Sequence, residues 1–243
     1  MSWSHPIYRS GKLIVDSDNN QRERKAPAIV GLLVAWGGAM LLVSPVARSL
    51  GNSPSLVAGV LGQVALWLLC AVVLCIVVCW EKKPLSSLWL KPFQWRSLVW
   101  AGVLMTGSIT LFFPMTEWAR RKLGLPGYTP GMETALAFPM WLRIVAVLTA
   151  GVVEETLFRG YAVTRLAQLS RSPLLAISLS SVVFAALHFP VWGAGPSVAF
   201  FIGGLATTAF FVWRRDLLAM ILAHVAIDMW GLVITPAFSQ WWK

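Results

Sequence analysis

Long apolar stretches separated by short charged segments make up most of the chain. A helix needs roughly 20 consecutive apolar residues to cross the hydrocarbon core of a bilayer. Stretches of about that length lie at residues 27–47, 56–80, 97–115, 140–160, 174–190, 197–213 and 217–235. The pattern predicts an all-α, polytopic integral membrane protein with about seven transmembrane helices, within a range of six to eight.

The longest interruption of this pattern is residues 112–139, which contain four prolines and several charged residues. Proline and glycine mark loops because they end regular helices. The sequence therefore predicts an irregular external loop here, with a short interfacial helix at residues 116–123.

The pattern divides the chain into three regions. Residues 1–26 are polar and end in a charged cluster, which predicts a cytoplasmic N-terminal tail. Residues 27–138 hold the first three helices and the irregular loop, and residues 139–236 hold the last four helices. A catalytic core is expected in the third region, because the polar side chains described below all lie there.

The composition agrees with a membrane protein, because 57% of the residues are hydrophobic, 12% are charged and the mean hydropathy is +0.69. An average soluble domain has roughly 25% charged residues. The net charge of +10 could indicate nucleic-acid binding, but the basic residues form short clusters between apolar stretches. They make no basic face or reading motif, so no nucleic-acid partner is expected.

The basic clusters also predict an orientation. Cytoplasmic loops of membrane proteins carry an excess of lysine and arginine, and a cytoplasmic N-terminus puts the clusters around Lys25, Lys83 and Arg214 on the inside. The cluster at 120–122 would lie outside and opposes this arrangement. The balance favours a cytoplasmic N-terminus.

Six ionisable side chains at membrane depth form the candidate site. Such residues are expensive to place in lipid, and where they occur they usually face a protein interior or a wet cavity and mark a functional site. All six lie in the third region: Glu154, Glu155, Arg159, His188, His224 and Asp228.

The adjacent carboxylates are expected to have different roles. Glu155 and Arg159 are four residues apart on a helix, so their side chains share a face and should form an ion pair. Glu154 projects about 100° around the helix from Glu155, which leaves it to face a cavity as a general base. The alternative is that both glutamates join neighbouring helices through Arg159 and Arg165.

The remaining three residues complete a site that could activate water. His224 and Asp228 share one face of the last span, and His188 ends the fifth. If the helices converge, Glu154 could take a proton from water that His188 positions, with His224 and Asp228 facing the oxyanion of a cleaved peptide bond. Alternatively, histidines and carboxylates are the usual ligands of catalytic zinc, and the candidate ligands are Glu154, His188, His224 and Asp228.

Three motifs carry a family resemblance. They are Glu-Glu-x-x-x-Arg at residues 154–159, Phe-x-x-x-His at 184–188 and His-x-x-x-Asp at 224–228. Their order, and their places on separate apolar segments, resemble the CAAX protease and bacteriocin-processing family of intramembrane proteases, which includes the type II CAAX prenyl endopeptidases.

The resemblance implies a catalytic core of about four helices, a wet cavity within the membrane and cleavage of a peptide near the membrane surface. By analogy Glu154 and His188 would activate water, and the last motif would stabilise the oxyanion. Asp228 departs from the asparagine found in some members, because an ionised aspartate cannot donate a hydrogen bond. It would be protonated, orient His224 or bind a metal. The implied substrate is a peptide or membrane protein, and the implied location is a bacterial inner membrane.

The predicted span boundaries do not bring the motifs to one depth. By ~1.5 Å rise per residue, Glu154 and His188 lie at different heights in straight helices with these boundaries. The sequence therefore predicts that the fourth helix continues to about residue 169 or is tilted.

The leading hypothesis is a membrane endopeptidase of glutamate or metal type. The rivals are a non-catalytic scaffold, as in bacteriocin immunity, and a proton-coupled transporter, although the sequence has no repeated halves of the kind common in transporters. The sequence defines no oligomeric state.

Overall fold

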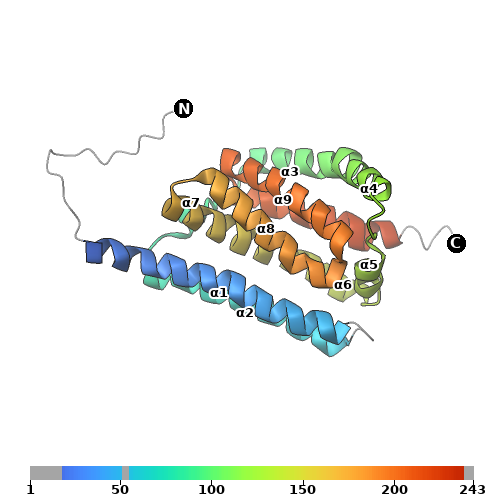
Figure 1. The fold of residues 1–243 in the computed structure, drawn as a ribbon, viewed down its shortest axis with the longest axis horizontal. Coiled ribbons are helices and arrows are strands. Elements are labelled where there is room, and N and C mark those ends of the chain that lie inside the picture. The colour runs from blue at the N-terminus through green and yellow to red at the C-terminus, as the bar shows by residue number, and fades with distance from the viewer. Residues whose placement is uncertain (1–17, 51–54, 238–243) are drawn as a thin grey trace.

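The computed structural model describes residues 18–50 and 55–237. Every regular element in these ranges is a helix, and the long helices lie roughly parallel or antiparallel in one bundle (Figure 1). The predicted all-α fold is confirmed. Six helical runs among the described residues are long and apolar enough to cross a membrane.

The first two helices form one side of the bundle (Figure 1). Helix α1 spans Asp18–Leu50, and α2 spans Leu56–Cys75 and continues as the π-helical turn η1, Ile76–Trp80. The span predicted at 56–80 is confirmed at both ends. Helix α1 begins within the stretch predicted to be a polar tail, and residues 1–17 of that tail lie outside the described residues.

The third run is longer than predicted. After the 3₁₀ turn η2 (Leu85–Leu88), α3 (Trp95–Gly107), η3 (Ser108–Phe112) and α4 (Phe113–Lys122) follow one another without a break. The prediction of an irregular loop over residues 112–139 is therefore wrong for its first part. The helix predicted at 116–123 is the end of this longer run, and a further short helix, α5, spans Thr129–Leu136.

Local chemistry explains why this run does not stop. Pro114 is the second residue of α4 and follows the wide turn of η3, where its missing N–H is tolerated. Glu117 lies 2.7 Å from both Arg120 and Arg121, at i+3 and i+4, so the charges of this segment support a helix.

The fourth run carries both glutamates and lies at the centre of the bundle. It consists of α6 (Met140–Thr149), the π-helical segment η4 (Ala150–Val163) and α7 (Thr164–Ser170). It reaches Ser170, so the predicted continuation past residue 160 is confirmed. Segment η4 packs against α1, α2, α8, α9 and α10, and most of its residues are buried.

The last three helices surround η4. They are α8 (Pro173–Trp192), α9 (Ala194–Arg214) and α10 (Leu217–Met229), which ends in the π-helical turn η5 (Trp230–Ile234). The α8–α9 connection is a single residue, Gly193, whose φ of 79° with ψ of −175° is a conformation that almost only glycine adopts. A tight antiparallel pair of helices results.

Side-chain caps define where two of these helices begin. The N–H of Leu175 donates to Ser172 Oγ at 3.2 Å, directly before α8. The N–H of Ala219 donates to Asp216 Oδ1 at 3.1 Å, and Ser97 Oγ of α3 donates to Asp216 Oδ2 at 2.7 Å. Asp216 therefore caps α10 and also ties it to α3.

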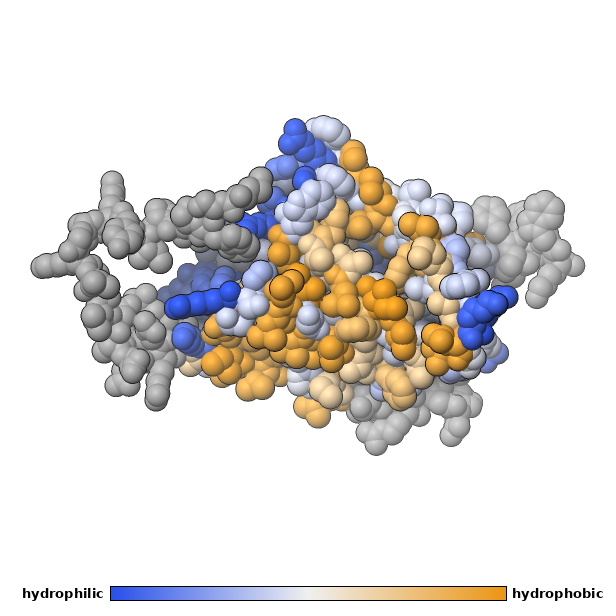
Figure 2. Space-filling view, turned by 45° about the horizontal axis from the view of Figure 1, so that its top comes forward, coloured by the Kyte–Doolittle hydropathy of each residue, from blue (hydrophilic) through white to orange (hydrophobic). Residues whose placement is uncertain are grey.

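The outer surface is apolar, as a lipid-facing surface must be. Figure 2 shows a broad hydrophobic face with hydrophilic residues toward its ends. Exposed large apolar side chains come from α1, α2 and α3, among them Leu33, Leu41, Leu61, Leu68, Leu98 and Val103. Together with the six apolar runs, this surface supports an integral membrane protein.

We predict that Gly151→Ala destabilises the bundle. A Cβ at Gly151 would overlap the Val225 side chain and lie 3.1 Å from the Val225 backbone nitrogen, so η4 and α10 would have to separate. The expected loss is about 1–3 kcal/mol, measured as a lower midpoint of thermal unfolding in detergent. Gly102→Ala is the matched control, because a Cβ at Gly102 meets nothing within 4 Å. An equal loss in both variants would contradict close η4–α10 packing as the cause.

Candidate active site

Glu154 of η4 and His188 of α8 face each other. Glu154 Oε2 lies 3.9 Å from His188 Nε2. His188 Nδ1 lies 2.7 Å from the Phe184 carbonyl oxygen. A carbonyl can only accept, so Nδ1 carries the proton, and in the neutral ring Nε2 is the acceptor that faces Glu154.

Aromatic rings hold the His188 imidazole in this orientation. Its centroid is 4.3 Å from that of Phe184 and 4.7 Å from that of Phe200 on α9. The motif Phe-x-x-x-His therefore has a physical meaning here: Phe184 supplies both the carbonyl that accepts from His188 and one of the rings that pack against it.

Glu155 and Arg159 form the predicted ion pair. Arg159 Nη1 donates to Glu155 Oε1 at 3.0 Å, and the two side chains are only 5% and 3% exposed. The guanidinium also lies over the Phe184 ring, 4.3 Å from its centroid, and Nη2 is 3.4 Å from Thr207 Oγ1 on α9. The sequence does not distinguish Thr207 from other helix hydroxyls, because its contact to Arg159 depends on the α9–η4 packing.

His224 of α10 lies between two carboxylates. Its Nδ1 is 2.8 Å from Glu155 Oε1, and its Nε2 is 3.4 Å from Asp228 Oδ2. The His224–Asp228 pair is the one that helix spacing predicts. The bond from His224 to Glu155 was not predicted, and it connects the buried ion pair with the last motif.

Exposure separates the six side chains into two groups. Glu155 and Arg159 are buried, whereas the other four retain between 19% and 29% of their side-chain surface: Glu154, His188, His224 and Asp228. Only the second group can meet a water molecule or substrate directly. One oxygen of that group, Glu154 Oε2, is enclosed and has no hydrogen-bond partner among the residues that the structure describes.

The longer fourth helix explains how the motifs reach one depth. Counted from the turn between α7 and α8, Glu154 lies sixteen residues back from Ser170 and His188 lies fifteen residues on from Pro173. The two segments are antiparallel neighbours, so the extension of the fourth run to Ser170 lets the two side chains meet, as their 3.9 Å separation shows.

The arrangement does not fit a zinc site. Among the residues that the structure describes, no three His, Cys, Asp or Glu side chains are placed to hold a metal ion. Both nitrogens of His224 face carboxylate oxygens, which can only accept, so neither nitrogen directs a lone pair toward an ion. The metal set Glu154, His188, His224 and Asp228 is therefore not assembled in this geometry.

Comparison with known proteins gives one match, over the part of the chain that carries this site. Residues 136–230 match the family model of type II CAAX prenyl endopeptidases, described as Rce1-like. The match contains all three motifs and confirms the resemblance that they predict. No curated protein and no solved structure matches the chain.

We predict that Arg159→Met destabilises the protein strongly. It leaves Glu155 as a buried carboxylate without its guanidinium partner, which costs about 3–5 kcal/mol when a buried pair loses one member. The measurement is the unfolding midpoint in detergent. Arg121→Met is the matched control, because Arg121 pairs with Glu117 at an exposed site and should cause no measurable change. The double variant Glu155→Gln/Arg159→Met should be more stable than Arg159→Met alone, and a less stable double variant would count against the buried pair.

Proposed function

We propose that the protein is an intramembrane endopeptidase that hydrolyses a peptide bond of a membrane-associated peptide or protein. One observation carries the proposal: an enclosed carboxylate oxygen of Glu154 without a hydrogen-bond partner faces the acceptor nitrogen of His188. Two acceptors suit the two hydrogens of one water. With hydrogen bonds of ~2.8 Å, a water bridging the 3.9 Å gap has an angle of about 90° at its oxygen.

In this mechanism Glu154 is the general base. It takes one proton from the water as the oxygen attacks the carbonyl carbon, while His188 accepts a hydrogen bond from the other and holds the water in place. Glu154 then delivers its proton to the amide nitrogen as the C–N bond breaks. The second proton of the water stays on the new carboxyl group and then passes to the amine, so the products are a carboxylate and an ammonium ion.

His224 is the proposed donor to the oxyanion. Its Nδ1 is committed to Glu155 at 2.8 Å, whereas the 3.4 Å contact from Nε2 to Asp228 is longer than an ordinary hydrogen bond. The Nε2 proton can therefore turn to a developing negative oxygen. Asp228 attracts the Nε2 side of the ring in the resting site and so orients His224, which is the role most compatible with a carboxylate at this position.

The family match and the apolar outer surface of the bundle support a substrate that is itself associated with the membrane. We propose a chain held at the membrane by its own apolar segment or by a lipid group, in a bacterial inner membrane with the N-terminus of the enzyme in the cytoplasm. A prenylated C-terminal peptide is the first probe to use, and its unprenylated counterpart tests whether the lipid is needed.

We predict that Glu154→Gln lowers kcat for cleavage of such a peptide by at least about a hundredfold, because the amide cannot take the proton. The assay uses purified protein in detergent or liposomes and follows the new amine terminus by mass spectrometry. Glu133→Gln is the matched control: it is the same chemical change at an exposed residue of α5. Near-normal cleavage by a correctly folded Glu154→Gln variant would contradict this mechanism.

Further measurements separate the rivals. Metal analysis should find no zinc bound to the purified protein, and treatment with 1,10-phenanthroline should leave cleavage unchanged. Loss of activity that zinc restores would support a metal mechanism. A scaffold gives no cleavage by wild type with any probe. A transporter gives proton-coupled uptake into liposomes that depends on Glu154.

A further inference from the structure

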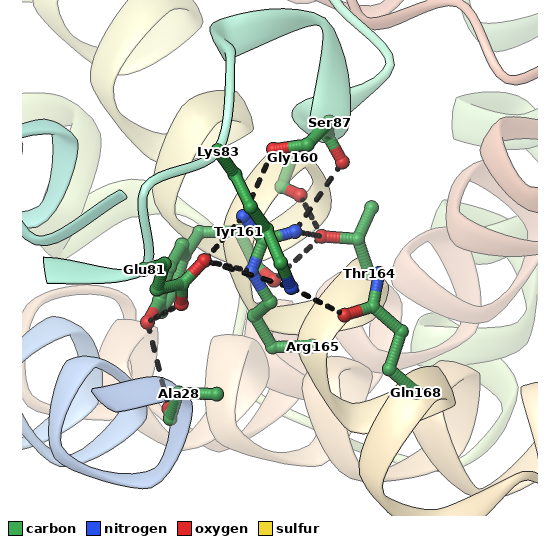
Figure 3. Close-up of polar contacts among 9 residues, drawn as sticks. All are labelled: Ala28, Glu81, Lys83, Ser87, Gly160, Tyr161, Thr164, Arg165 and Gln168. Atoms are coloured by element: carbon green, nitrogen blue, oxygen red, sulfur yellow. Dashed lines mark hydrogen bonds and ion pairs between the residues drawn. The ribbon is translucent and has the colours of Figure 1, made fainter. Parts of the chain in front are cut away.

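A second buried polar cluster lies where the fourth helical run leaves η4 (Figure 3). It is centred on Arg165, eleven residues after Glu154, and is called here the Arg165 network: Glu81, Ser87, Tyr161, Thr164 and Arg165. The Arg165 side chain is 0% exposed, and it heads the fully buried side chains of the described residues in volume. The proposed chemistry uses none of these residues.

Every nitrogen of the Arg165 guanidinium has a partner. Nε donates to Glu81 Oε2 at 2.8 Å, and Nη2 lies 2.7 Å from the same oxygen and 3.0 Å from Ser87 Oγ. Nη1 donates to Thr164 Oγ1 at 3.1 Å and lies 3.3 Å from the Ser87 carbonyl oxygen. Figure 3 shows these bonds converging from the connection after η1 onto one turn of helix.

Tyr161 extends the network to α1. Its hydroxyl donates to Glu81 Oε1 at 2.9 Å and lies 3.5 Å from the Ala28 carbonyl oxygen. A Cβ on Gly31 would overlap the tyrosine ring, so the glycine provides the space that this ring occupies. The network thereby joins α1, the connection between η1 and α3, and the catalytic helix.

Lys83 lies beside the Arg165 network, on the side of the surface. Its Nζ donates to Gln168 Oε1 at 3.1 Å and lies 3.9 Å from Glu81 Oε2. Burial, together with the neighbouring Arg165 charge, lowers the pKa of the Lys83 amine, and Glu81 opposes this change. Lys83 is 40% exposed and Arg165 is fully buried, so these contacts lead from the surface of the protein to its interior.

We propose that the Arg165 network is a positioning device that sets the rotation and height of the helix carrying Glu154. The hydrophobic effect that holds η4 against its neighbours is non-directional, so it defines the rotation of a helix less sharply than hydrogen bonds do. A guanidinium held by a carboxylate, a hydroxyl and a carbonyl tolerates little rotation or sliding. The inference rests on the proposed function, because the geometry it protects is the gap between Glu154 and His188.

Energetic considerations support a positioning role over a purely stabilising one. A buried ion pair contributes little more stability than apolar side chains of the same size, because both charges lose their hydration. Displacing a catalytic group by about 1 Å can lower a rate about a hundredfold. Loss of the network is therefore expected to lower the rate of cleavage strongly while it lowers the free energy of unfolding only a little.

The first test is Tyr161→Phe, which removes one hydroxyl and leaves the Glu81–Arg165 pair. We expect kcat to fall by roughly three- to tenfold with KM unchanged. Tyr128→Phe is the matched control, because the Tyr128 hydroxyl has no hydrogen-bond partner within the described part of the chain, and it should leave both constants at wild-type values.

The second test is the double variant Glu81→Gln/Arg165→Gln, which removes both charges and leaves no unpaired ion. Its readout without activity is the nitrogen NMR spectrum of the imidazoles, which is simple because the chain has three histidines. The His188 signals, assigned with His188→Gln, should move although the altered residues do not touch His188. The kcat should fall by at least about tenfold.

The outcomes separate the two proposals. Wild-type kcat and unmoved His188 signals in a folded double variant would overturn the positioning role and leave the proposed function standing. Moved His188 signals in the double variant, together with a wild-type protein that cleaves no probe, would support the positioning role and contradict the proposed function. If the double variant does not fold, Tyr161→Phe alone decides, and an unchanged kcat and unmoved His188 signals there would overturn the positioning role.

Discussion

The constraint on which this structure depends is the cost of placing charge inside a membrane protein. Glu155 and Arg159 neutralise each other at 3.0 Å with almost no exposed surface, and their position on the central helix requires polar or aromatic neighbours. His224 from α10 contacts Glu155, Thr207 from α9 accepts from Arg159, and the Phe184 ring from α8 lies against the guanidinium. The pair therefore determines which faces of three other helices point inward, and Glu154 remains beside it to face His188.

Much of the fold could be predicted from the sequence, because apolar length and helical spacing are local properties. The span at 56–80 matches α2 and η1, and the Glu155–Arg159 pair follows from a spacing of four. The prediction failed at Pro114, where proline and charge suggested a loop. A proline at the start of a helical turn and an arginine pairing with Glu117 both favour a helix, so the same residues allow two interpretations.

The features that the sequence did not predict are contacts between distant segments. The bond from His224 to Glu155 joins residues 69 apart, and the Arg165 network depends on Glu81, which spacing alone treats as an ordinary charge between two spans. The motifs nonetheless indicated six side chains that the structure brings close to one another around η4. Their ionisable character at membrane depth is a local signal, even though their geometry is not.

The wide winding of η4 has a consequence for comparing this protein with others. A π-helical turn holds more residues than an α-helical turn, so a helical wheel drawn at about 100° per residue loses phase across 150–163. Relatives whose corresponding helix is α-helical would fit the same space with fewer residues. Alignments through this segment should therefore place gaps inside the helix and not in the loops, or the two ends of the central helix will be compared out of register.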